Sequence, residues 1–112
     1  MVYIVMPNNY KNALLDLTAT SVTTLYTCPG ATTALVKSIL VSEDSGNADT
    51  ITVTITDADA AVFSIFKVKA VASNTTVELL SEPLVVTENQ VLKVNAATAN
   101  RLHVVASLLE IS

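Results

Sequence analysis

The chain has few side chains that could do chemistry, and they lie far apart in the sequence. His103 is the only histidine and Cys28 the only cysteine among 112 residues. A metal site needs several such ligands, and a redox pair needs a second cysteine. No candidate nucleophile stands at a fixed spacing from His103, which has apolar neighbours. We therefore interpret both residues as structural, with Cys28 an inert and partly buried thiol.

Five carboxylates come closest to forming a site. Glu43, Asp44 and Asp49 lie in one polar segment, and Asp57 and Asp59 lie in the next. Calcium binds clusters of oxygen ligands, but the spacing here differs from that of a calcium-binding loop. A glycosidase needs two carboxylates on either side of a bond, which alternate residues of one short turn do not provide. We interpret both segments as solvated turns and expect no catalysis, no metal and no cofactor.

The charge composition disfavours two classes of partner. Six basic and ten acidic residues give a net charge of -4, and the basic residues are scattered. This acidic excess would repel phosphates, so we expect no nucleic acid partner. No apolar run approaches the roughly 18 residues of a spanning helix, so we also expect no membrane partner. The first residues lack the basic start and apolar length of a secretory signal, so we expect the protein to stay where it is made.

The elements that position these residues are strands. Valine, isoleucine and threonine make up about a third of the chain, and β-branched side chains favour pleated sheets. Residues 50–56 alternate strictly between threonine and an aliphatic residue, which indicates a half-buried strand. Eight strands are predicted, over residues 13–17, 22–27, 34–41, 50–56, 61–69, 75–80, 90–95 and 101–111. Their spacing is typical of a sandwich or barrel, and the short loops favour antiparallel pairing.

The sequence therefore predicts one all-β domain over residues 1–112. We expect an antiparallel β-sandwich of about eight strands, with either jelly-roll or immunoglobulin-like connections, and an N-terminal arm over residues 1–11. Residues 34–41 and 61–69 carry apolar side chains on both faces, which predicts positions inside a sheet rather than at its edge. In the first of these strands we expect one face to hold Leu35, Ile39 and Val41 and the other to hold Val36 and Leu40.

Both ends of the chain predict contacts with other molecules. In the last strand Leu102, Val104, Ala106 and Leu108 share one face, and only one face can meet the domain's own core. The opposite face holds Val105, Leu109 and Ile111, and we expect Leu109 and Ile111 to contact a partner. At the front, Val2, Tyr3, Ile4 and Val5 form a short apolar strand ahead of a loop, which we interpret as an arm that adds to a neighbour's sheet edge. The alternative is an ordinary first strand that pairs within its own domain.

The low content of charged residues also predicts assembly. Only 14% of residues are charged, against about 25% in an average globular domain. A small domain has a large surface for its volume, so part of this surface is expected to be covered by further copies or partners. The alternative is a surface hydrated by threonine, serine, asparagine and alanine.

The order of these features resembles small β-sandwich virion proteins of tailed bacteriophages, in particular capsid decoration (cement) proteins and related head or tail subunits. The resemblance covers about residues 17–111. It rests on the segments TLYTCP at 24–29, TTALVKSILV at 32–41, the threonine-alternating strand, EPLVV at 82–86 before VLKV at 91–94, and SLLEI at 107–111.

The resemblance implies a non-enzymatic protein of the phage capsid surface that is made in the host cytoplasm. Its implied partners are the major capsid protein and further copies of itself, as a homotrimer, and its implied role is to join neighbouring shell subunits. Two alternatives stay open. One is a tail-fibre or adhesin module that binds surface glycan, which the small number of aromatic residues disfavours, and the other is a different head-tail or non-viral structural subunit.

Overall fold

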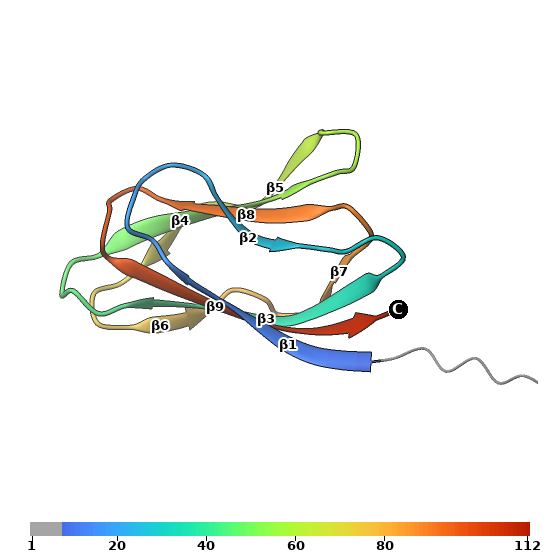
Figure 1. The fold of residues 1–112 in the computed structure, drawn as a ribbon. Helices are drawn as coiled ribbons and strands as arrows, with labels where there is room; N and C mark the ends of the chain where they lie inside the picture. Colours follow the sequence, from blue (N-terminus) through green and yellow to red (C-terminus); the bar gives the residue numbers. More distant parts are fainter. Residues whose placement is uncertain (1–7) are drawn as a thin grey trace, which may run out of the picture.

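Two antiparallel sheets packed face to face make up residues 8–112, the part of the chain that this computed structural model describes (Figure 1). Nine strands form in this part, and no helix. They are β1 (Asn8–Asp16), β2 (Thr23–Thr27), β3 (Thr33–Glu43), β4 (Asp49–Thr56), β5 (Val62–Val71), β6 (Thr76–Glu78), β7 (Leu84–Val86), β8 (Val91–Ala96) and β9 (Leu102–Ile111). The predicted antiparallel β-sandwich is confirmed, with nine strands in place of about eight.

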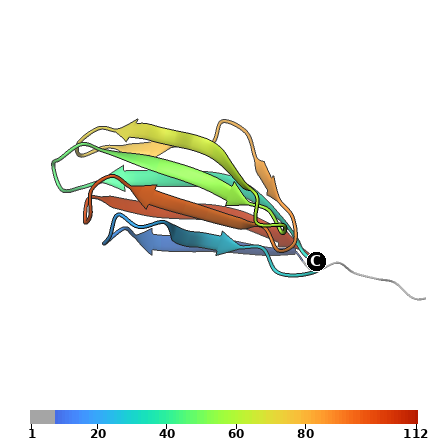
Figure 2. The ribbon, with the colours of Figure 1, turned by 90° about the horizontal axis from the view of Figure 1, so that it is seen from above.

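The order of the strands identifies the connections as those of a jelly roll. The five-stranded sheet has the order β1-β9-β3-β6, with the short β7 also paired to β3, and the four-stranded sheet has the order β2-β8-β4-β5. The pairs are nested along the chain: β1 with β9, β2 with β8, β3 with β6, and β4 with β5. This nesting of antiparallel pairs across two sheets is the jelly-roll arrangement. The strands run along the long axis of the molecule (Figure 2).

The core lies between the sheets and follows the alternation of the strands. In β9 the side chains of Leu102, Val104, Ala106 and Leu108 are buried, as the sequence predicts. In β4, Ile51 and Val53 are fully buried, and the alternating threonines are half-buried on the outer side. Burying such aliphatic side chains is the main force that holds two sheets together.

A one-residue bulge in β3 changes which side chains face the core. Val36 pairs with Leu108 and Ser38 pairs with the next residue of β9, Ser107. Lys37 is therefore an extra residue without a position in the ladder, which is the definition of a β-bulge. The bulge moves every later residue of β3 to the opposite face from the one that strict alternation predicts.

The predicted faces of β3 are therefore wrong beyond the bulge. Ile39 and Val41 are fully buried together with Val36, whereas Leu35 is half-buried and Leu40 is 37% exposed on the outer side. The prediction that this strand lies inside a sheet is correct, because β3 pairs with β9 on one side and with β6 and β7 on the other.

Other predictions are corrected by the strand order. β5 covers the strand predicted over 61–69, but among the described strands it pairs only with β4 and is an edge strand. Residues 8–11, predicted as part of the N-terminal arm, form the start of β1 and pair with β9 of the same domain. The rest of the predicted arm, residues 1–7, lies outside the described residues. β7 was missed because three residues after Pro83 are too short for a periodic signal.

Candidate assembly interface

The outer face of the five-stranded sheet carries a row of apolar side chains that crosses four strands. Tyr10 of β1 pairs with Leu109 of β9, Leu109 pairs with Leu35 of β3, and Leu35 pairs with Val85 of β7. Residues directly opposite each other in antiparallel strands project to the same face. These four residues, which we call the Tyr10 row, therefore form a continuous apolar strip across the sheet.

A second apolar strip lies four residues further along the strands. Leu14 pairs with Val105, and Val105 pairs with Leu40. In this Leu14 row and the Tyr10 row together, Tyr10 is 76% exposed, Leu14 69%, Val85 54% and Leu40 37%. Such values for large apolar residues in neighbouring positions mark a contact surface more strongly than single exposed residues do.

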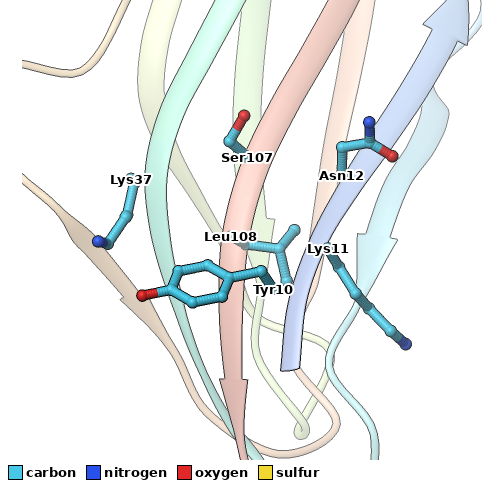
Figure 3. A pocket seen from close by; sticks show the side chains of 6 residues that line it. All are labelled: Tyr10, Lys11, Asn12, Lys37, Ser107 and Leu108. Carbon is cyan, nitrogen blue, oxygen red and sulfur yellow. The ribbon is translucent and has the colours of Figure 1, made fainter. Parts of the chain in front are cut away.

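Tyr10 and Lys37 form one end of this surface. The Tyr10 ring lies across β9 toward β3, where the Lys37 ammonium stands 5.6 Å from the ring centroid (Figure 3). This distance allows a cation–π contact. Lys37 directly follows the buried Val36, so ordinary alternation along β3 places it on this outer face. The two side chains border a shallow hollow of about 730 Å³ that is also lined by Lys11, Asn12, Ser107 and Leu108.

The opposite end of the surface is acidic. His103 lies between two carboxylates, with Nε2 at 3.3 Å from Asp16 Oδ1 and Nδ1 at 3.6 Å from Asp44 Oδ1. Asp16 and Asp44 remain 61% and 70% exposed. The carboxylates approach opposite nitrogens of the ring, so the three groups do not converge on one point. In this arrangement His103 joins β9 to Asp16 at the end of β1 and to Asp44 directly after β3.

The outer face of the four-stranded sheet is different in character. Its middle is made by paired polar residues, namely Thr24, Lys93, Thr54 and Ser64 in one row and Thr52 and Asn95 in the next. Uncharged hydroxyl and amide groups hydrate well and do not require a partner. The two outer faces of the sandwich are therefore chemically distinct, and the apolar one belongs to the five-stranded sheet.

Exposed apolar side chains also lie on β5, in the hairpin that it forms with β4. Val62, Phe63 and Val68 are 62%, 57% and 60% exposed. The start of β5 projects away from the rest of the sandwich (Figure 1), which leaves these side chains without the cover that a second sheet would give. Val62 and Phe63 project to opposite faces of the hairpin, so these side chains do not form a continuous strip like the Tyr10 row.

Two of the predicted interface residues lie on the apolar outer face. Leu109 is the β9 member of the Tyr10 row and Ile111 lies one row further, and both are half-buried. The other four, Val2, Tyr3, Ile4 and Val5, lie outside the described residues. Sequence reasoning missed Tyr10, Leu14, Leu40 and Val85, because their place on this face depends on strand register. The bulge at Lys37 sets the face of Leu40, the short strand β7 that of Val85, and the pairing of β1 with β9 that of Tyr10 and Leu14.

A partly buried polar cluster joins the two sheets near the C-terminus. The Tyr26 hydroxyl of β2 donates a hydrogen bond to Glu110 of β9, and Lys11 Nζ lies 3.1 Å from the other carboxylate oxygen. The hydrogen bond from Tyr26 and the charge of Lys11 lower the pKa of Glu110, although burial opposes them. Burial and the bond to Glu110 raise the pKa of Tyr26, which keeps its proton available for donation.

Cys28 lies two residues after Tyr26. It is fully buried, whereas the sequence predicted a partly buried thiol. Burial raises the pKa of its thiol, and the Sγ atom lies 3.3 Å from the carbonyl oxygen of Thr32. A protonated and inaccessible thiol is a poor nucleophile, which agrees with the inert role predicted for it.

Glu43 corrects the prediction of a solvated turn. It is the last residue of β3, is 1% exposed, and its carboxylate accepts hydrogen bonds from the backbone amides of Ser45, Gly46, Asn47 and Asn74. Burial acts to raise the pKa of Glu43, but these bonds and one from the Ser45 hydroxyl outweigh it and lower the pKa to about 2. Glu43 therefore organises two neighbouring loops.

Asp49 is also buried, and it accepts a hydrogen bond from the amide of Thr98.

Among residues 8–112, no group of three or more histidine, cysteine or carboxylate side chains is placed to hold a metal ion. The same part of the chain contains no helix with the length and apolar character needed to cross a bilayer. No protein-family model matches the chain, and no curated protein matches it.

Proposed function

We propose that this chain is a non-enzymatic structural subunit of a virion, and more specifically a decoration protein that binds and stabilises the head of a tailed phage. Its partners in this proposal are the major capsid protein and further copies of the chain. The proposal rests on one observation, the apolar outer face built by the Tyr10 and Leu14 rows.

A joining role requires at least two contact surfaces on one subunit. The apolar sheet face and the β4–β5 hairpin are separate exposed surfaces of this domain. Stable interfaces bury about 800 Å² on each partner, and apolar area contributes roughly 25 cal/mol per Å² before the entropy of association is subtracted. Simultaneous contacts to several neighbours then strengthen binding through effective concentration.

The fold and the charge content are consistent with this proposal. Jelly rolls occur in viral capsid domains, and also in lectins and cupins, so the fold alone does not select a function. Only 14% of residues are charged, which suits a subunit whose surface is covered in an assembly.

A glycan-binding module of a tail fibre or adhesin is the second candidate. One observation favours it, because the exposed Tyr10 ring lies beside the polar side chains of Asn12 and Ser107 in a shallow hollow. Aromatic rings stack on sugars, and polar groups fix their orientation. The apolar rows on both sides of this hollow favour a protein partner instead.

The test is a binding experiment with purified tailed-phage heads from the virus that encodes the chain. The purified protein is added to heads that lack it, and the bound copies per head are counted after sedimentation. We expect saturable binding at micromolar concentration and a higher temperature of head disruption. Absence of binding, together with binding to host surface polysaccharide, would replace this function with the second candidate.

A further inference from the structure

We propose that the outer face of the five-stranded sheet binds the same face of a second copy of this chain, with the strands of the two copies running in opposite directions. This contact does not depend on the virion role, because it is a property of the isolated protein. It pairs copies two by two, which differs from the homotrimer that the family resemblance implies.

The face is self-complementary along the strand direction. The Tyr10 row and the Leu14 row are separated by one row of small polar side chains, Asn12, Ser107 and Ser38. A twofold axis that passes through Ser107, parallel to the sheet and perpendicular to its strands, places the Tyr10 row of each copy on the Leu14 row of the other. At the β7 end of the Tyr10 row, Val85 then faces Glu78, the β6 partner of Leu40. Such an isologous contact uses one patch on both subunits and closes after two copies.

The charges on the face favour a contact in which the strands of the two copies run in opposite directions. Lys37 stands beside the Tyr10 row, whereas Asp16 and Asp44 lie beyond the Leu14 row at the other end of the face. A contact with parallel strands would place the carboxylates of one copy beside the same carboxylates of the other. Reversal separates the two acidic ends, and it turns the Lys37 ammonium, which reaches from the bulge toward Tyr10, to the side where the partner's carboxylates lie.

The size of the face is sufficient for a dimer. Four strands about 4.8 Å apart and five rows about 6.8 Å apart give a face of roughly 20 by 30 Å on each copy. Two such faces bury about 1,200 Å² in total, which is the lower limit for specific and stable interfaces. The outer face of the four-stranded sheet lacks a comparable apolar area in its middle, so the contact is confined to one side of the molecule.

Sedimentation velocity of the full chain over a range of concentrations tests the proposal. The wild type is expected to form a dimer with a dissociation constant in the micromolar range. Leu14→Asp buries a charge in the contact and is expected to raise this constant at least about tenfold. Val22→Asp is the matched control, because Val22 precedes β2, is 62% exposed, and lies outside both the face and the β4–β5 hairpin. Circular dichroism establishes that each variant is folded.

Charge reversal tests the direction of the strands. Lys37→Glu is expected to weaken the dimer, and the triple variant Lys37→Glu, Asp16→Lys, Asp44→Lys is expected to restore it because the pattern is inverted as a whole. A monomeric wild type, an effect of Val22→Asp equal to that of Leu14→Asp, or no recovery in the triple variant overturns the proposal. A dimer that Val2→Asp with Ile4→Asp abolishes and Leu14→Asp leaves intact would also overturn it, since the contact would then belong to residues 1–7.

Discussion

Replacing Tyr26 with phenylalanine tests how the two sheets are held together. The substitution keeps the ring and removes the hydroxyl that donates to Glu110 across the sandwich. Glu110 is only 6% exposed, and its remaining side-chain partner among the described residues is Lys11, which is 53% exposed and partly screened by water. A hydrogen bond to a charged group contributes about 1.5–3 kcal/mol, so we expect a loss of that size at pH 7.

The loss is expected to depend on pH. The hydrogen bond from Tyr26 is the largest cause that lowers the pKa of Glu110. A carboxyl group whose folded pKa is lowered stabilises the fold above its ordinary pKa of about 4.3, and this stabilisation disappears as the pH falls through the folded pKa. The difference between wild type and Tyr26→Phe should therefore shrink as the pH falls below about 4.3.

Thermal unfolding followed by circular dichroism measures this effect. For a domain of this length the expected loss corresponds to a fall in Tm of about 6–13 °C at pH 7. Tyr10→Phe is the matched control, because Tyr10 is 76% exposed and makes no hydrogen bond through its hydroxyl within the described residues. Equal effects of the two substitutions, or a difference that stays constant down to pH 3, would refute the role assigned to the Tyr26–Glu110 bond.

Three further predictions address the core and the buried polar groups. Ile39→Ala should cost about 2–5 kcal/mol and Leu40→Ala less than about 1 kcal/mol in urea unfolding; the reverse order would contradict the faces set by the bulge. Glu43→Gln should lower the free energy of unfolding above pH 4.5, and this loss should disappear as the pH falls toward 2. Urea unfolding midpoints measured at a series of pH values test this, with the exposed Glu82→Gln as the control that should cost little stability. The Cys28 thiol should react with a disulfide reagent slowly in the native protein and fully in urea, and rapid native reaction would show that it is accessible.

The sequence predicted the fold class because its signal is repeated in many strands. Strict alternation in β4 and the two-sided pattern of β9 define which side chains meet the core, and the structure confirms both. The strand order could not be predicted, because it depends on which distant segments pair. The jelly-roll connections follow from the pairing of β1 with β9 and of β2 with β8, which are segments far apart in the sequence.

The candidate interface was predicted only in part. Leu109 and Ile111 were identified from β9 alone, since one strand cannot bury both of its faces in one core. The strip around them needs the register of four strands, and a single extra residue, Lys37, inverts the pattern of β3. Glu43 was predicted to lie in a solvated turn because its neighbours in the sequence are polar. Its carboxylate is instead buried beneath that loop and accepts hydrogen bonds from the loop's backbone amides.

Central to this account is the claim that the apolar outer face of the five-stranded sheet is covered in the assembled particle. A cryo-electron microscopy reconstruction of the phage head with the protein bound tests this claim most directly. We predict that Tyr10 and Leu14 lie against another subunit, with the polar threonine face of the four-stranded sheet in solvent. A bound subunit whose Tyr10 and Leu14 rows face open solvent would contradict the account.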